Sequence, residues 1–223
     1  GNQLGEAIRL HTNRKGKEVR DRAIEMLELV GINEPEKRIK QYPFELSGGM
    51  RQRVMIAMAL ACEPDILSAD EPTTALDVTI QAQILELMQD LQKKLGMAVI
   101  LVTHDLGVIA DMCDNIIVMY GGHICERGTA DEIFYNPRHE YTKGLLRSIP
   151  NVNNMKEKLI PIAGTPIIGP NLPKGFAFCA RCDEAMKICL EQQPEELTIN
   201  ENHKAACWMN VRRMLEEEGG GAQ

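Results

Sequence analysis

The sequence lacks any long hydrophobic run, any basic run and any visible signal peptide. Its longest apolar stretches, residues 54–62 and 97–102, are core-sized and fall far short of the roughly 20 residues that a membrane helix needs. A formal net charge of −7 argues against a protein that binds nucleic acid through a large phosphate-neutralising surface. These absences disfavour a membrane-spanning chain, a secreted chain and a nucleic-acid partner.

Cysteine is present, but not in the pattern of a secreted disulfide scaffold. The chain has seven cysteines in 223 residues, an odd count without regular spacing. A reducing cytoplasm is therefore the simplest location. The length suffices for one substantial hydrophobic core or two small ones.

A glycine-rich helix start is the first feature that suggests phosphate binding. Ser47-Gly48-Gly49 immediately precede residues 50–61, a run of good helix formers free of glycine and proline. Glycines let a ligand approach the backbone, and the free N–H groups and dipole of a helix N-terminus attract anions. Taken alone, the same residues also fit an ordinary N-cap and turn.

A pair of carboxylates strengthens the case. Pro64 ends the helix, residues 65–69 predict a short buried strand, and Asp70 and Glu71 follow at its carboxyl end. Ligands of open α/β sheets bind at that edge. One carboxylate suits hydrated magnesium and the other suits activation of a water for attack on a phosphoryl group. The alternative is a solvated acidic turn, which the preceding Ser-Gly-Gly disfavours.

Four motifs in order resemble those of ABC-type ATPases. Residues 46–53, LSGGMRQR, resemble the signature motif, and residues 66–71 resemble the Walker B strand with its glutamate. Residues 75–77, ALD, resemble the D-loop, and His104 falls where the family has its switch histidine. Ser68 departs from the usual apolar Walker B residue, a change that costs little if its hydroxyl bonds to nearby backbone.

The resemblance assigns the nucleotide-contacting residues. Ser47, Gly48 and Gly49 would contact the γ-phosphate of an ATP that a second subunit mainly holds. Gln52 would also bind ATP, and Asp77 would line the interface between the two subunits.

The resemblance also assigns the catalytic residues. Asp70 would hold Mg²⁺ through water, Glu71 would be the general base, and His104 would sense the γ-phosphate. A buried structural histidine is the alternative for His104, but its place at the end of an apolar strand and before Asp105 suits a polar partner better.

The phosphate loop of this family is missing from the sequence. No GxxxxGK(S/T) occurs, and the chain begins at Gly1 instead of methionine. We therefore expect the carboxyl-terminal part of a longer polypeptide, which as given should not hydrolyse ATP.

The expected fold class is α/β, an incomplete ABC-type ATPase domain with a small irregular extension. Residues 1–62 predict a helical subdomain and the signature helix, including an amphipathic helix over 18–30 that Gly31 ends. Residues 63–136 alternate strands and helices, which predicts part of a parallel sheet with covered faces. Helices are expected at 78–95 and 106–113, strands at 97–103 and 115–120, and a Gly121-Gly122 hairpin after them.

Residues 137–223 are expected to form a second module. Prolines recur there, and residues 136–150 resemble the carboxyl-terminal extension of the ATP-binding subunits of oligopeptide and dipeptide ABC importers. His139-Glu140-Tyr141 replaces the family's usual His-Pro-Tyr.

Four cysteines of this module predict a metal site: Cys179, Cys182, Cys189 and Cys207. Their spacing alone is compatible with zinc, an iron–sulfur cluster or free thiols. The resemblance to the importer extension implies a 4Fe-4S cluster, with Zn²⁺ as the alternative. The other cysteines are expected to be core residues, and His203 is not expected to be a ligand.

The resemblance implies an ATPase subunit that powers import of di- or oligopeptides from the cytoplasmic face of the membrane. It would pair with a second ABC ATPase subunit, as a homodimer or heterodimer, and with two transmembrane permease subunits, and work indirectly with a peptide-binding protein. Alternatives are an importer for nickel or another small solute, and a metal-binding regulatory module without ATPase activity. A DNA- or ribosome-directed ABC ATPase should carry coiled-coil insertions or basic surfaces, which the sequence does not contain.

Overall fold

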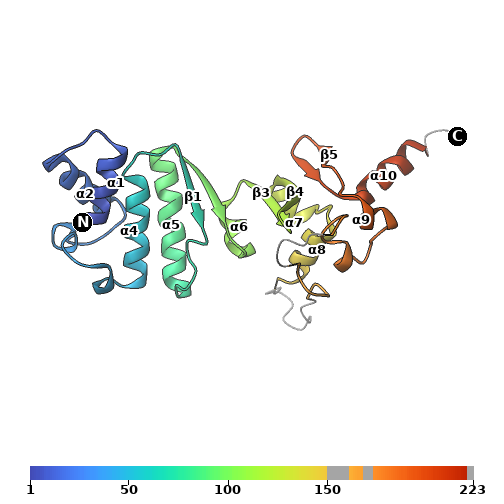
Figure 1. Ribbon diagram of the computed structural model, residues 1–223, viewed down its shortest axis with the longest axis horizontal. Coiled ribbons are helices and arrows are strands. Elements are labelled where there is room, and N and C mark those ends of the chain that lie inside the picture. The colour runs from blue at the N-terminus through green and yellow to red at the C-terminus, as the bar shows by residue number, and fades with distance from the viewer. Residues whose placement is uncertain (150–160, 168–172, 220–223) are drawn as a thin grey trace. The chain divides into compact units, whose positions relative to one another are not determined.

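The computed structural model describes residues 1–149, 161–167 and 173–219 (Figure 1). Contacts divide the chain into two compact units, Gly1–Val108 and Ile109–Gln223. Among the described residues, no helix combines the length and the apolar composition that crossing a membrane requires.

Helices dominate the first part of the first unit, as predicted. Gly31 has a positive φ of 73° just after the second helix, the conformation expected of a residue that terminates a helix. Helices α1 and α2 contact each other and both contact α4. The elements are α1 (Asn2–His11), α2 (Lys17–Leu29), α3 (Pro35–Arg38), η1 (Pro43–Glu45) and α4 (Gly48–Leu60).

Helix α4 begins two residues earlier than the sequence predicted. Ser47 caps it by accepting a hydrogen bond from the Met50 N–H at 3.3 Å, so Gly48 and Gly49 lie inside the first turn. A Cβ atom on Gly49 would lie 2.7 Å from Cγ2 of Ile80. The glycine is therefore required for α4 to approach the start of α5 (Val78–Leu95).

Two parallel strands form the sheet of the first unit. β1 (Ile66–Asp70) pairs with β2 (Ala98–Val102), and the register sets Asp70 beside Val102. Leu67 is buried, but Ile66, Ile100 and Val102 are 50–59% exposed. The prediction that this sheet is covered on both faces is therefore wrong for the described residues, because only two strands lie in it and apolar side chains of both remain open to solvent.

The second unit contains a sheet that joins both predicted modules. β3 (Asn115–Tyr120) and β4 (His123–Thr129) form the expected hairpin, whose Gly121 and Gly122 have positive φ. Strand β6 (His203–Ala205) pairs with β4, and β5 (Leu197–Asn200) pairs with β6. This unit thus contains residues from both predicted domains, with β3 and β4 from the first and β5 and β6 from the second.

The region beyond residue 137 is also more regular than predicted. Besides β5 and β6 it contains α8 (Glu140–Arg147), η2 (Cys179–Arg181), α9 (Lys187–Glu191) and α10 (Trp208–Gly219). Helix α6 (Leu106–Met112) and helix α7 (Ala130–Tyr135) complete the elements. Thr129 caps α7 by accepting a hydrogen bond from the Glu132 N–H.

Two buried histidines, His139 and His203, connect elements of the second unit through hydrogen bonds and packing. His203 is fully buried, with Nε2 2.7 Å from a Glu126 oxygen and Nδ1 3.2 Å from a Glu132 oxygen. His139 caps α8 by accepting the Tyr141 N–H at 3.0 Å, and it packs against the ring of Phe176. Burial lowers the pKa of His139 to about 4, so this ring is neutral at neutral pH.

Acid is expected to destabilise the second unit through His139. Its pKa in the folded state is about 4 and its ordinary value is 6.5, so the unfolded chain binds the proton first as the pH falls. Stability is complete above pH 6.5 and declines toward pH 4, by on the order of 3 kcal/mol. Urea unfolding followed by fluorescence of Trp208, the single tryptophan, measures the decline.

His139→Asn keeps a capping acceptor but removes the titration, so it should flatten the pH dependence. His123→Asn, at an exposed position in β4, is the matched control and should leave it unchanged. An equally steep decline in His139→Asn would contradict the assignment.

Candidate functional site

Glu71 and His104 meet at the carboxyl ends of the two parallel strands. The Glu71 N–H donates to the Val102 carbonyl at 2.8 Å, which extends the β1–β2 pairing by one residue. Oε1 of Glu71 lies 3.0 Å from Nδ1 of His104. Both side chains are accessible, 44% and 81% exposed respectively. The two predicted catalytic residues are thus brought together across 33 positions of sequence.

The backbone of Glu71 adopts an uncommon conformation. Its φ is +45°, in the left-handed region that a residue with a side chain rarely occupies. The Thr74 hydroxyl donates to Oε2 of Glu71 at 2.8 Å, and the Thr74 N–H donates to its carbonyl. Hydrogen bonds from Thr74 and then from His104 lower the pKa of Glu71. The carboxylate is therefore ionised and oriented before any ligand arrives.

The remaining predicted nucleotide residues lie at helix starts and at the end of β1. Asp77 caps α5 by accepting the Ile80 N–H at 3.0 Å, as Ser47 caps α4. Asp70 is the last residue of β1 and is exposed. Gln52 lies in the second turn of α4 and is partly buried.

Two polar residues near the pair were not predicted as part of the site. Gln81 donates a side-chain hydrogen bond to Asp105 Oδ2 at 3.2 Å. Asp105 Oδ1 accepts the Gly107 N–H at 2.9 Å, which fixes the turn after His104. Thr74 was also missed, although its place three residues after Glu71 and two after Pro72 is a turn signal.

The arrangement can support water activation beside a phosphate. Glu71 is an ionised acceptor, His104 retains Nε2 for a second partner, and Asp70, which precedes Glu71 in the chain, is exposed. Mg²⁺ usually binds proteins through one or two carboxylates and keeps several waters. The exposed Asp70 fits that requirement.

The four predicted metal-binding cysteines lie in the second unit. Cys179 and Cys189 are buried in one apolar cluster with Phe176 and Phe178, and Cys182 packs against it. Burial raises the pKa of Cys182 to about 11 and also raises the pKa values of Cys179 and Cys207.

These cysteines do not form a metal site as they are placed. Within residues 1–149, 161–167 and 173–219, no group of three or more histidine, cysteine, aspartate or glutamate side chains is arranged to hold a metal ion. The thiols as placed therefore do not fit a bound cluster or zinc.

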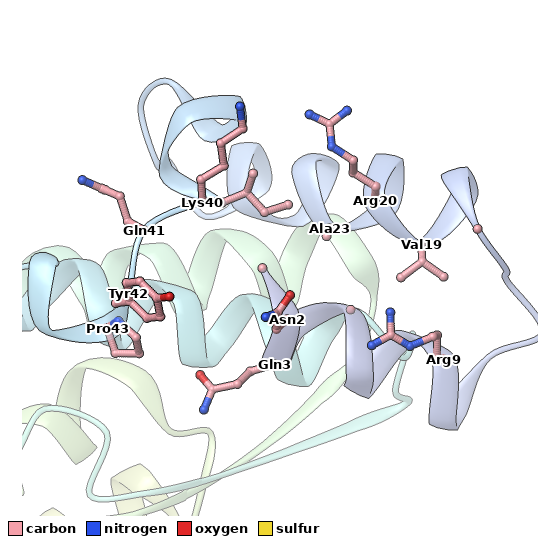
Figure 2. A pocket seen from close by; sticks show the side chains of 14 residues that line it. Asn2, Gln3, Arg9, Val19, Arg20, Ala23, Lys40, Gln41, Tyr42 and Pro43 are labelled. Carbon is pink, nitrogen blue, oxygen red and sulfur yellow. The ribbon is translucent and has the colours of Figure 1, made fainter.

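A basic hollow of about 600 Å³ lies in the helical part, lined by residues of α1, α2 and the segment before α4 (Figure 2). Arg9, Arg20 and Lys40 line it, and none of its described lining residues is acidic. Tyr42, also in the lining, stacks on the exposed Phe44 with ring centroids 5.5 Å apart. None of the predicted nucleotide residues lines the hollow.

Comparison with protein families gives two matches along the chain. Residues 2–74 match the family described as ABC transporter. Residues 125–189 match the family described as oligopeptide/dipeptide transporter, C-terminal region.

Individual relatives agree with these matches. The oligopeptide transport ATP-binding protein OppD of Bacillus subtilis is 55% identical over 94% of this chain and 59% of its own length. The dipeptide transport ATP-binding protein DppD of the same organism is 52% identical over 96% of this chain and 64% of its own length. The chain thus spans about three fifths of the length of these relatives. The structure of CbiO1 from Clostridium perfringens, part of an ABC transporter complex, is similar over 60% of this chain and 51% of its own, with 32% identity and a TM-score of 0.52.

Removing the Thr74 hydroxyl is expected to raise the pKa of Glu71 toward its ordinary value, because that hydrogen bond is the largest cause of the lowering. Thr74→Val tests this, with carboxyl NMR titration of Glu71 as the measurement. Thr73→Val is the neighbouring control and should leave the pKa unchanged. An unshifted pKa in Thr74→Val would contradict the role of this hydroxyl.

Proposed function

The chain belongs to the ABC transporter ATP-binding proteins, in the group of oligopeptide and dipeptide transport subunits, and from this membership we propose that it works in the ATPase that powers peptide import. The observation that carries the proposal is the Glu71–His104 contact of 3.0 Å at the ends of β1 and β2. An importer for nickel or another small solute, and a regulatory module without ATPase activity, were the alternatives from sequence. The relatives are named for oligopeptide and dipeptide transport, which favours neither of these two alternatives.

Glu71 acts as the general base in this proposal. Its ionised carboxylate accepts a proton from the attacking water while Thr74 and His104 hold it in place. His104 uses Nε2 to contact the γ-phosphate when ATP is bound. Asp70 would hold magnesium through water, and the ion would supply positive charge beside the phosphate oxygens.

The signature residues serve a second subunit's nucleotide. The exposed helix start at Ser47, with Gly48 and Gly49 in the first turn of α4, offers backbone N–H groups to a phosphate. We place Gln52 and Asp77 at the same seam. Two such subunits would close head to tail over two ATP molecules and drive two permease subunits at the inner face of the membrane, supplied by a peptide-binding protein. What supports these partners is the transport function in the relatives' names.

We also propose a four-cysteine metal site, which the resemblance to the importer extension implies. After burial, the largest cause, the neighbouring Cys207 and Cys189 also raise the pKa of Cys182, and Cys179 and Cys189 share one core. Binding a 4Fe-4S cluster, or zinc, would have to draw them into one ligand set that the present arrangement lacks.

Replacing Glu71 tests the enzymatic assignment. The sequence given has no GxxxxGK(S/T), so the assay uses a full-length subunit that carries this loop. Glu71→Gln should leave ATP binding intact and lower turnover by at least about 100-fold, because amide nitrogen and oxygen cannot take the water's proton. ATP hydrolysis and peptide uptake in vesicles reconstituted with the permease are the measurements. Near-normal turnover would refute the role of Glu71, and Glu86→Gln, on helix α5, is the control.

Metal analysis tests the cysteine site. Protein purified without oxygen should contain about four irons and four sulfides per chain, and Cys179→Ser or Cys207→Ser should abolish them. Cys62→Ser, in the first unit, is the matched control. Stoichiometric zinc would replace the cluster by the alternative, and absence of both metals would remove the site while leaving the ATPase proposal intact.

A further inference from the structure

Two side-chain hydrogen bonds join the segment that begins at Glu71 to the turn that carries His104. The first is the Glu71–His104 contact at 3.0 Å. The second lies further along both segments, where Nε2 of Gln81 donates to Oδ2 of Asp105 at 3.2 Å. The chain from Glu71 to Gln81 is therefore tied to the His104 turn at both of its ends.

Gln81 lies on a part of α5 that the core holds in place. The helix starts at a cap, because the Asp77 side chain accepts the Ile80 N–H at 3.0 Å. Ile80 packs closely on α4, since a Cβ atom on Gly49 would lie 2.7 Å from its Cγ2. The buried residues of the same helix are Ile84, Met88 and Leu91. Close packing on this scale leaves little room for movement, so the Gln81 donor is a fixed reference point.

The turn after β2 is organised around Asp105. The Asp105 N–H donates to Oγ1 of Thr103 at 3.1 Å, and Oδ1 of Asp105 accepts the N–H groups of Gly107 at 2.9 Å and Val108 at 3.3 Å. Its other carboxylate oxygen accepts from Gln81. The His104 side chain is 81% exposed, so packing contributes little to its orientation. The position of this ring therefore follows the turn that Asp105 sets.

The segment on the other side of the contact carries backbone strain. Glu71 has a φ of +45° and Ala75 a φ of +64°, both in the left-handed region that residues with side chains rarely adopt. Such conformations persist only where surrounding contacts hold them. Within the segment, the Thr74 N–H donates to the Glu71 carbonyl and the Leu76 N–H donates to the Thr73 carbonyl. Release of either end of the segment would let it relax and would carry Glu71 away from His104.

We propose that Gln81 is a positioning residue that acts through Asp105 to hold His104 in contact with Glu71. The consequence for catalysis rests on the proposed ATPase function, whereas the contact itself exists without nucleotide. A single accessible hydrogen bond contributes little to the stability of a whole fold. Loss of the Gln81 donor should therefore displace His104 without unfolding the chain.

Gln81→Met tests the positioning in the 223-residue chain without nucleotide. Methionine keeps the unbranched shape and the helix propensity of glutamine but has no N–H to donate. We expect the ring-nitrogen NMR resonances of His104, assigned by their loss in His104→Gln, to shift. Gln83→Met, at an exposed position of the same helix, is the matched control and should leave them unchanged. Circular dichroism verifies that each variant is folded.

Gln81→Arg separates the donor from the rest of the side chain. Arginine can donate to the Asp105 carboxylate, so this variant should restore the natural His104 resonances. The proposal is overturned if these resonances stay unchanged in Gln81→Met, if Gln81→Arg fails to restore them, or if Gln83→Met shifts them equally.

Turnover measures the consequence in a full-length subunit that carries the GxxxxGK(S/T) loop. Gln81→Met should lower kcat by roughly 10-fold and leave the KM for ATP unchanged, because a small misplacement of His104 affects the reaction more than binding. Gln81→Arg should recover most of the loss, and an unchanged kcat in Gln81→Met would refute the positioning role. Failure of the ATPase proposal is recognised separately, by near-normal turnover in Glu71→Gln.

Discussion

The pairing of β1 with β2 is the constraint on which the candidate site depends. Parallel pairing aligns the carboxyl ends of two strands that are separated in sequence by the whole of α5. The hydrogen bond from Glu71 N–H to the Val102 carbonyl continues this alignment into the loops. A shift of one residue would turn Glu71 away from His104, because neighbouring positions of a strand face opposite sides of the sheet. The Glu71–His104 contact thus depends on the register of β1 and β2.

The resemblance to ABC ATPases named two residues that the structure brings together, but it did not name the side chains that contact them. Glu71 and His104 were named from their resemblance to ABC ATPases, and the structure brings them into contact. Thr74 was not named, because a threonine in a turn has no distinguishing pattern until its hydroxyl is seen on the carboxylate. The same holds for Gln81, whose partner Asp105 lies 24 residues away.

The sequence predicted elements whose ends are set by neighbouring residues. It did not predict elements that form only by pairing with a distant strand. Gly96 has a φ of 65° and ends α5 as expected, since glycine tolerates this conformation. Strand β6 has only three residues and is specified by β4, about 80 positions earlier, so no local pattern identifies it. The buried His203 that bridges Glu126 and Glu132 looks in sequence like one more surface histidine. Its role exists only once the sheet has formed.

The positive φ of Glu71 implies a trade-off between the stability of the fold and the proposed role of this side chain. A left-handed backbone costs a residue with a side chain on the order of 1 kcal/mol, and glycine would avoid that cost. The chain instead carries an acid at this turn. A search for more heat-resistant variants would therefore tend to select glycine at position 71 and lose the proposed proton acceptor, so thermal selection of this protein would have to be coupled to a selection for the proposed ATPase turnover.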